Sequence, residues 1–201
     1  MVSRVSKNNN IRIVAIILAA GQGKRIGYIP KWKLLIDGKN ILTLIKDKLL
    51  YAGISDICCI LNKYSISDII SHENISYIIN DNFEIGMISS VYTGINKGIS
   101  GDYYMFFPVD HPFIDSKTIL MLCRCIENTS GILKPTYNGQ SGHPIIVSNK
   151  VANKIPISYY GGLKSFFDDH NFNTDTIETN DPGILININT ISDLKKYKID
   201  C

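Results

Sequence analysis

The chain has 201 residues, of which 45% are hydrophobic and 19% are charged, and its formal net charge is +3. The length suits one domain with one sizeable core, and the composition is ordinary for a globular protein. The small net charge, without a cluster of lysine and arginine, argues against nucleic acid or an anionic membrane as a partner.

The start of the chain carries no apolar segment typical of a secretory signal. No apolar run approaches the roughly 20 residues that span a bilayer. The five cysteines, an odd number, then indicate a cytoplasmic protein with free thiols. Cys123 and Cys125 lack a second pair at zinc-finger spacing, so we interpret them as small hydrophobic residues. We expect residues 1–10 to form a loose tail and residues 11–201 to form the domain.

Strand-like runs alternate with helix-like runs along most of the chain. Ile11–Leu18 is continuously apolar except for Arg12, which predicts a strand buried on both faces. Ile41–Tyr51 has helical spacing of its apolar residues. The next expected elements are a strand Asp56–Asn62, a short helix Ser67–Ser71, a strand Ile75–Asn80, a helix Met87–Lys97, a strand Asp102–Val109 and a helix Ser116–Glu127 with Ser116 as its N-cap.

After Gly131 the pattern becomes shorter and more irregular. The expected elements there are a loop between Gly139 and Gly142, strands Pro144–Ser148, Asn173–Glu178 and Gly183–Ile188, and helices Gly162–Asp169 and Thr190–Lys196. This alternation predicts an α/β fold with a Rossmann-like, doubly wound and mostly parallel sheet in a single domain. Ligands of such sheets bind at the carboxyl ends of the strands.

The first strand runs directly into a glycine-rich segment, Leu18–Gly27 (LAAGQGKRIG). Glycines let backbone N–H groups converge on a phosphate, and Arg25 adds a cation. The segment is not a P-loop, because Lys24 is followed by arginine and not by serine or threonine. Its glycines follow GxGxxxG, which also differs from the dinucleotide fingerprint. The alternative interpretation is an ordinary strand-to-helix turn.

Together with Pro30–Lys39 (PKWKLLIDGK), this loop resembles the signature of the molybdenum-cofactor-type NTP transferase family, the MobA-like nucleotidyltransferases. The resemblance implies that the loop binds the triphosphate and that a lysine shortly after it contacts phosphate. Lys33 is the first choice for that lysine and Lys31 the alternate, and a solvated surface lysine is the alternative for either. The implied nucleotide-binding residues are Leu18, Ala19, Ala20, Gly21, Gln22, Gly23 and Lys31, with Arg25 and Lys33 in catalytic roles.

The strand Asp102–Val109 is followed by an aspartate, in the segment FPVDHPF. A carboxylate at a strand tip faces the ligand crevice, and Mg²⁺ prefers such hard oxygen ligands while it bridges phosphates. The family has an Asp-x-Pro motif here whose aspartate binds the catalytic metal, which implies that role for Asp110. The alternative is that Asp110 caps the next turn. We interpret His111 as a polar turn residue in preference to a ligand or proton donor.

Two further segments indicate which branch of the family the chain resembles. Gly86–Gly94 (GMISSVYTG) is similar to the GMxSSL segment of molybdopterin cytidylyltransferases, where guanylyltransferases have GPLAG. This implies that Ser89 and Ser90 lie near the nucleotide at a helix N-terminus, and the alternative is packing against the sheet. Gly139–Pro144 (GQSGHP) resembles the GxxGHP loop of the family, which implies that His143 lies near the acceptor.

Gly162–Phe167 (GLKSFF) matches the family motif GARxLL, with Lys164 in place of the arginine. The resemblance implies that Lys164 contacts the acceptor. The Gly-Asp pair that usually precedes this motif is absent, and Tyr159 and Tyr160 stand there instead. The identity of the acceptor is therefore not determined by the motif.

The segment Asp181–Leu194 (DPGILININTISDL) resembles DxGxxxDIDTxxDL, with Asn187 and Asn189 in place of both central aspartates. In the family, the residue at the position of Asn187 is the second ligand of the metal. The resemblance therefore implies a metal site made of Asp110 and Asn187. An asparagine carbonyl oxygen binds Mg²⁺ without adding negative charge, so we expect weaker metal binding or a metal that arrives with the NTP. Asp193 is interpreted as a first-turn helix acid.

The resemblance covers residues 11–196 and implies a Mg²⁺-dependent nucleotidyltransferase. It would transfer CMP from CTP, the favoured NTP, to a phosphorylated small-molecule acceptor such as molybdopterin and release pyrophosphate, with an acceptor enzyme as a partner in cofactor delivery. The alternatives are a sugar- or alditol-phosphate nucleotidyltransferase and a degenerate NTP-binding regulatory domain. A nucleotide-sugar glycosyltransferase is disfavoured by the missing Asp-x-Asp, and a Rossmann dehydrogenase by the glycine spacing.

Overall fold

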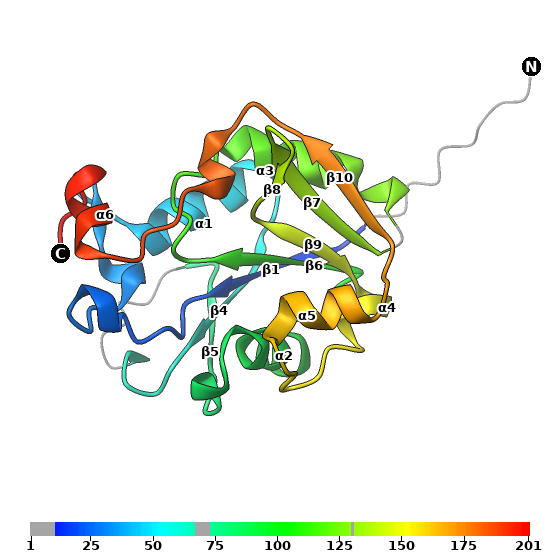
Figure 1. Ribbon diagram of the computed structural model, residues 1–201, viewed down its shortest axis with the longest axis horizontal. Coiled ribbons are helices and arrows are strands. Elements are labelled where there is room, and N and C mark those ends of the chain that lie inside the picture. The colour runs from blue at the N-terminus through cyan, green and yellow to red at the C-terminus, as the bar shows by residue number, and fades with distance from the viewer. Residues whose placement is uncertain (1–10, 67–72, 130) are drawn as a thin grey trace, which may run out of the picture.

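The computed structural model describes residues 11–66, 73–129 and 131–201. Within these residues, eight strands form one mixed sheet in the order β10-β7-β9-β6-β1-β4-β5, with β8 paired to β7 (Figure 1). The strands are β1 (Ile13–Leu18), β4 (Asp56–Leu61), β5 (Ser76–Ile79), β6 (Tyr103–Pro108), β7 (Ile132–Tyr137), β8 (Gln140–Ser141), β9 (Ile145–Ser148) and β10 (Thr174–Glu178). A small antiparallel ribbon consists of β2 (Leu35–Ile36) and β3 (Lys39–Asn40).

Helices cover both faces of the sheet (Figure 1). They are α1 (Ile41–Tyr51), α2 (Met87–Lys97), α3 (Ser116–Cys125), α4 (Asn149–Ala152), α5 (Gly162–Asp169) and α6 (Ile191–Lys196). Helices α1 and α3 lie on one face, and α2, α4 and α5 lie on the other. No helix of the described residues is long and apolar enough to cross a membrane.

The order of the strands places a switch point at the centre of the sheet. From β1 the chain moves outward to β4 and β5, and it then returns to β6 on the other side of β1. β1 is parallel to both β4 and β6, and Leu18 at its end pairs with Pro108 at the end of β6. The segments that follow these two strands therefore leave the same edge of the sheet side by side, where α/β proteins bind their ligands.

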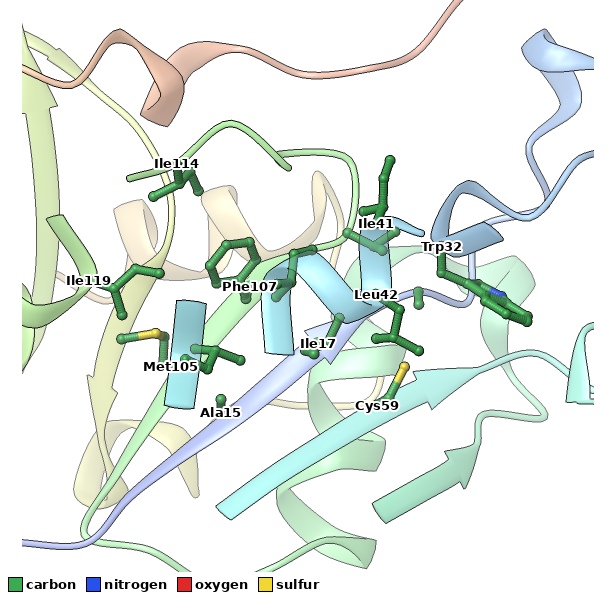
Figure 2. Packing of buried hydrophobic residues seen from close by; sticks show 14 of the residues in the cluster. Ala15, Ile17, Trp32, Ile41, Leu42, Cys59, Met105, Phe107, Ile114 and Ile119 are labelled. Carbon is green, nitrogen blue, oxygen red and sulfur yellow. The ribbon is translucent and has the colours of Figure 1, made fainter. Parts of the chain in front are cut away.

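The central strand β1 supplies a core on each face, because successive side chains of a strand point in opposite directions. Ala15 and Ile17 belong to the cluster under α1 and α3, whereas Val14 and Ile16 belong to the cluster over α2 and α5. Figure 2 shows the first cluster, in which Ala15 and Ile17 lie among Leu42, Met105, Phe107 and Ile119. Burial on both faces explains why β1 is continuously apolar.

Helix α2 approaches β1 closely at a glycine. A Cβ on Gly94 would lie 2.6 Å from Cγ2 of Ile16, which is closer than packed carbon atoms allow. Glycine at this position therefore sets the distance between α2 and the sheet, and with it the position of the N-terminus of α2.

The predicted fold class is confirmed, and α1 and α2 have the predicted bounds. The sheet is mixed because β9 runs antiparallel to β6 and β7. Strand β7 was not predicted, since Lys134 and Pro135 interrupt its apolar pattern. The short helix predicted over 67–71 lies outside the described residues, as does the tail over 1–10.

Two local predictions are wrong. The expected strand Gly183–Ile188 is instead a 3₁₀ helix, Pro182–Leu185, followed by extended residues that pair with no strand of the described sheet. Asp181 starts this turn, because its side chain accepts a hydrogen bond from the Gly183 amide at 2.8 Å. The N-cap of α3 is Asp115, whose carboxylate accepts from the Lys117 amide at 2.9 Å, and Ser116 is the first helical residue.

Candidate active site

A cavity of about 200 Å³ opens at the switch point of the sheet. Three segments that are distant in the sequence line it, together with Lys31 and Phe83. They are the end of β1 with the glycine loop (Leu18, Ala20, Gly21), the start of α2 (Gly86, Met87, Ser90), and the segment at the end of β6 (Pro108, Val109, Asp110). The positive end of the α2 dipole therefore faces the cavity, which favours an anionic ligand.

The glycine loop curls back on itself after β1. Gly23 has a left-handed φ of 63°, and its carbonyl accepts hydrogen bonds from the amides of Ile26 at 2.9 Å and Tyr28 at 3.0 Å. A Cβ on Gly23 would lie 2.1 Å from the carbonyl oxygen of Ile29, so no other residue fits this turn. The resulting 3₁₀ turn, Lys24–Ile26, carries Arg25.

Two cations from the segment after β1 meet polar groups that are distant in the sequence, one at the tip of β6 and one near the C-terminus. Nζ of Lys31 lies 3.0 Å from Oδ2 of Asp110 and 2.7 Å from Oδ1 of Asn189. Nη2 of Arg25 donates to the same Asn189 oxygen at 3.1 Å. The guanidinium and the ammonium are therefore held next to each other at the tip of β6.

The structure brings Lys31, and not Lys33, to Asp110. Lys31 is largely buried, with 15% of its side chain exposed, whereas Nζ of Lys33 lies 5.6 Å from the centroid of the Trp32 ring. The two lysines are the first and last residues of a 3₁₀ helix. Because this helix has about three residues per turn, their side chains point in different directions.

Asp110 is an ionised carboxylate at neutral pH. Burial raises its pKa, but the hydrogen bond from His111 and the charge of Lys31 outweigh burial and hold the pKa of Asp110 at about 2. Nδ1 of His111 lies 2.8 Å from Oδ1 of Asp110, and Lys31 occupies Oδ2. His111 was interpreted as a polar turn residue, and the structure buries it to 7% exposure with its ring nitrogen on the Asp110 carboxylate.

His143 lies against His111, with ring centroids 4.6 Å apart and planes at 64°. The peptide bond between His143 and Pro144 is cis, and the His143 amide donates to the carbonyl of Ile184 at 3.0 Å. Burial, together with the neighbouring His111, lowers the pKa of His143 to about 4. Its buried Nδ1 has no hydrogen-bond partner among the described residues. The imidazole is therefore neutral, and it adjoins the residues that hold Asp110.

The two serines at the start of α2 bind to a buried asparagine. Nδ2 of Asn80 donates to Oγ of Ser89 at 2.9 Å and to Oγ of Ser90 at 3.0 Å. Ser89 is fully buried, and its hydroxyl is also within 2.8 Å of the carbonyl oxygens of Asn82 and Gly86. Ser90 lines the cavity. Ser89 thus holds the start of the helix, and Ser90 is the serine that a ligand would meet.

The segment before α6 is held against the tip of β6. The Ile188 amide donates to the Asp110 carbonyl at 2.8 Å, and the Asn189 amide donates to Oδ2 of Asp193 at 2.9 Å. Thr190 and Asp193 form a capping box, which confirms Asp193 as a helix acid. Of the two asparagines in this segment, Asn189 is the one whose side-chain amide contacts Lys31, whereas Asn187 is exposed.

The structure therefore assembles Arg25, Lys31, Ser90 and Asp110 around one cavity or its border. His143 joins them through His111. Lys164 is exposed on α5, and its contact with an acceptor stays a prediction. Sequence reasoning missed His111 and Asn189 as site residues. Two features of the sequence could have revealed them: His111 directly follows Asp110, and Asn189 lies within the C-terminal motif.

Comparison with known proteins identifies the family of the chain. Residues 15–174 match the model of the MobA-like NTP transferase domain. A molybdenum cofactor guanylyltransferase from Histophilus somni is 25% identical over 193 residues, which cover 92% of this chain and 96% of that protein.

Two solved structures show the same fold. Rv0371c from Mycobacterium tuberculosis has a TM-score of 0.79 at 16% identity, over 92% of this chain and 97% of that one. The 4-diphosphocytidyl-2C-methyl-D-erythritol synthase from Anaerococcus prevotii has a TM-score of 0.70 at 15% identity, over 93% of this chain and 94% of that one. Because the family model matches most of the chain, this protein belongs to the MobA-like NTP transferase family and is a nucleotidyltransferase.

Proposed function

We propose that this nucleotidyltransferase transfers CMP from CTP to a phosphorylated small-molecule acceptor such as molybdopterin and releases pyrophosphate. One observation carries the proposal. Lys31 contacts both Asp110 and Asn189, and Arg25 contacts the same Asn189, beside a cavity where the glycine loop meets the tip of β6. Two cations next to a strand-tip carboxylate suit the triphosphate of an NTP.

The reaction consists of in-line attack by a phosphate oxygen of the acceptor on the α-phosphorus, with pyrophosphate as the leaving group. It needs no covalent enzyme intermediate, so the protein acts by positioning and by neutralising charge. Arg25 and Lys31 would neutralise the leaving pyrophosphate. His143 and Lys164 are the proposed contacts of the acceptor, and His143 is neutral and lies next to the catalytic carboxylate through His111.

The chemistry of Asp110 fits a Mg²⁺ ion, because its carboxylate is ionised and lines the cavity. Asn187, the proposed second ligand, is exposed and lies outside the lining of the cavity, so its role rests on the sequence motif. The described residues contain no group of three or more His, Cys, Asp or Glu arranged to hold an ion alone, so phosphate oxygens and water would complete its coordination. When bound, the ion would supply positive charge to the phosphates. Rv0371c, which shares the fold, has been solved in complex with manganese.

Two nucleotides are candidates for the NTP substrate, and they differ in their base. The resemblance of Gly86–Gly94 to cytidylyltransferases supports CTP. GTP is the second candidate, because the curated relatives at 25% identity are named molybdenum cofactor guanylyltransferases. A cytoplasmic location and an acceptor enzyme as partner belong to the same proposal.

The direct test measures pyrophosphate release from each NTP with Mg²⁺ and either molybdopterin or a panel of sugar and alditol phosphates. Release with CTP and molybdopterin is expected. Release with GTP and molybdopterin would change the proposed base from cytosine to guanine. Release with a sugar or alditol phosphate would change the proposed acceptor. NTP binding without release for any pair would identify a degenerate regulatory domain. Arg25→Ala should weaken NTP binding, and unchanged affinity would refute the assignment of the glycine loop.

A further inference from the structure

A second cavity, of about 220 Å³, adjoins the first at the glycine loop. Gly21 lines both cavities. The second cavity is also lined by Gln22, Tyr28 and Tyr64, whereas Phe83 lines the first. The rings of Tyr64 and Phe83 contact each other edge to face, with centroids 5.9 Å apart and planes at 87°. An aromatic pair therefore joins the two cavities.

A buried asparagine fixes each of these two rings to the sheet. Asn62, which follows β4, donates from Nδ2 to the Ala20 carbonyl at 2.9 Å and accepts from the Tyr64 amide at 2.9 Å. Tyr64 is thus tied to the glycine loop itself. Asn80, which follows β5, accepts from the Asn82 amide at 2.9 Å, directly before the 3₁₀ helix that carries Phe83.

These asparagines use their amide groups within the protein. Nδ2 of Asn62 is directed at backbone, and its Oδ1 accepts from the amides of Tyr64 and Ser65. Nδ2 of Asn80 binds the two serines of α2. The amide of Asn62, which also lines the second cavity, and the amide of Asn80 are therefore already engaged within the protein, whereas the exposed ring of Tyr64 remains for a ligand to contact.

Tyr64 is open to a ligand although its backbone is anchored. Its side chain is 64% exposed, and Nζ of Lys63 lies 5.2 Å from its ring centroid. Aromatic side chains that line a positively charged groove hold nucleic-acid bases by stacking, which is worth roughly 1–3 kcal/mol per base. The exposed ring beside a phosphate-binding loop has the same chemistry.

We propose that Tyr64, supported by Phe83, is the stacking platform for the base of the NTP. This inference rests on the proposed function, because Arg25 and Lys31 must hold the triphosphate for the base to reach the ring. Since every base has a flat π-face, stacking contributes affinity without choosing the base. Tyr64 is then a binding residue shared by CTP and GTP, and the choice between them depends on other groups.

The experiment is isothermal titration calorimetry of the full chain with Mg²⁺ and three ligands: CTP, GTP and inorganic tripolyphosphate. Tyr64→Ala should weaken binding of both nucleotides by between about 5-fold and 150-fold and leave tripolyphosphate unchanged. Tyr64→Phe keeps the ring and should restore nucleotide affinity. Tyr51→Ala is the matched control, because Tyr51 is 61% exposed on α1.

Phe83→Ala provides a second variant, with a smaller loss expected for the nucleotides alone. Unchanged CTP and GTP affinity in both alanine variants would overturn the stacking role. An equal loss for tripolyphosphate would also overturn it, because the variant would then have altered the phosphate loop. If the unmodified protein binds no NTP, the proposed function fails as well. If NTP binding depends on Arg25 but not on Tyr64, only the stacking inference fails.

Discussion

The ammonium of Lys31 lies 3.0 Å from a carboxylate oxygen of Asp110, although 79 residues separate them. Both side chains are largely buried, so this ion pair is stronger than one at the surface. Together with the hydrogen bond from His111, the pair keeps the carboxylate ionised. It also holds the Lys31 ammonium, which we propose binds phosphate, beside the proposed metal ligand.

Removal of the strand-tip carboxylate should abolish most of the activity and keep the fold. Asp110→Ala is expected to lower kcat/KM for the NTP by about 100-fold or more, because the metal loses its one carboxylate ligand. Pyrophosphate release measures the effect, and circular dichroism checks the fold. Asp110→Asn is the isosteric control and should also be impaired. Turnover close to that of the unmodified protein would exclude Asp110 from the chemistry.

The two lysines of the 3₁₀ helix should differ sharply. Lys31→Ala is expected to weaken NTP binding by about tenfold or more, because it removes a charged contact to phosphate and leaves Asp110 without its cation. Lys33→Ala should change affinity by about twofold at most, because the Lys33 ammonium lies near the Trp32 ring and Lys31 is the lysine that contacts Asp110. Calorimetric titration of each variant compares them directly. A larger loss for Lys33→Ala would return the phosphate-binding role to Lys33, the first choice from the sequence.

The two asparagines of the C-terminal motif should respond in opposite ways to a restored carboxylate. Asn187→Asp is expected to lower the Mg²⁺ concentration that gives half-maximal activity, because it adds a charged oxygen ligand. Asn189→Asp is expected to weaken NTP binding instead, since a carboxylate there would neutralise Lys31 and Arg25. Titrations of Mg²⁺ and NTP separate the two effects. An unchanged Mg²⁺ dependence in Asn187→Asp would exclude Asn187 as a ligand.

Stability should fall between pH 6.5 and pH 4 because of His143. Burial lowers the pKa of His143 from 6.5 to about 4 in the folded protein, so the unfolded chain binds the proton more readily. The free energy of unfolding should therefore decrease as pH drops through this range and level off below it, by roughly 3 kcal/mol in total. Asp110 loses its contribution at lower pH, between its unfolded value of 3.8 and about 2.

His143→Gln cannot take up this proton, so it should flatten the pH dependence between pH 6.5 and pH 4. Urea denaturation at several pH values in metal-free buffer makes the comparison. His170→Gln is a suitable control, since His170 is exposed after α5. An equally steep pH dependence in His143→Gln would show that another group is responsible.

Gly94→Ala should destabilise the protein although alanine favours helices. The gain in helix propensity is at most about 1 kcal/mol, whereas overpacking against Ile16 costs about 1–3 kcal/mol. Urea denaturation should show the net loss. The same substitution in an Ile16→Ala background should cost less, because the clashing atoms are gone. A more stable Gly94→Ala protein would contradict the close packing of α2 on β1.

Much of the fold and part of the site could be predicted from local sequence. The apolar run of β1 and the helical spacing of α1 and α2 are periodic patterns with one structural interpretation each. The glycine loop and Asp110 follow two parallel strands directly, so their meeting at one edge of the sheet follows from the fold class. The extended assignment of Gly183–Ile188 failed because Asp181 and Pro182 start a turn that apolar periodicity does not record.

The sequence by itself therefore determined the fold class and the positions of the glycine loop and Asp110 at the ends of two strands, each from a short continuous segment. Only the tertiary structure decided which lysine meets Asp110 and which asparagine meets that lysine. The contact between Lys31 and Asn189 spans 158 residues, and it depends on the Ile188 amide binding the Asp110 carbonyl. Local patterns carry no information on such a contact, because its geometry comes from the packing of segments that are far apart in the chain.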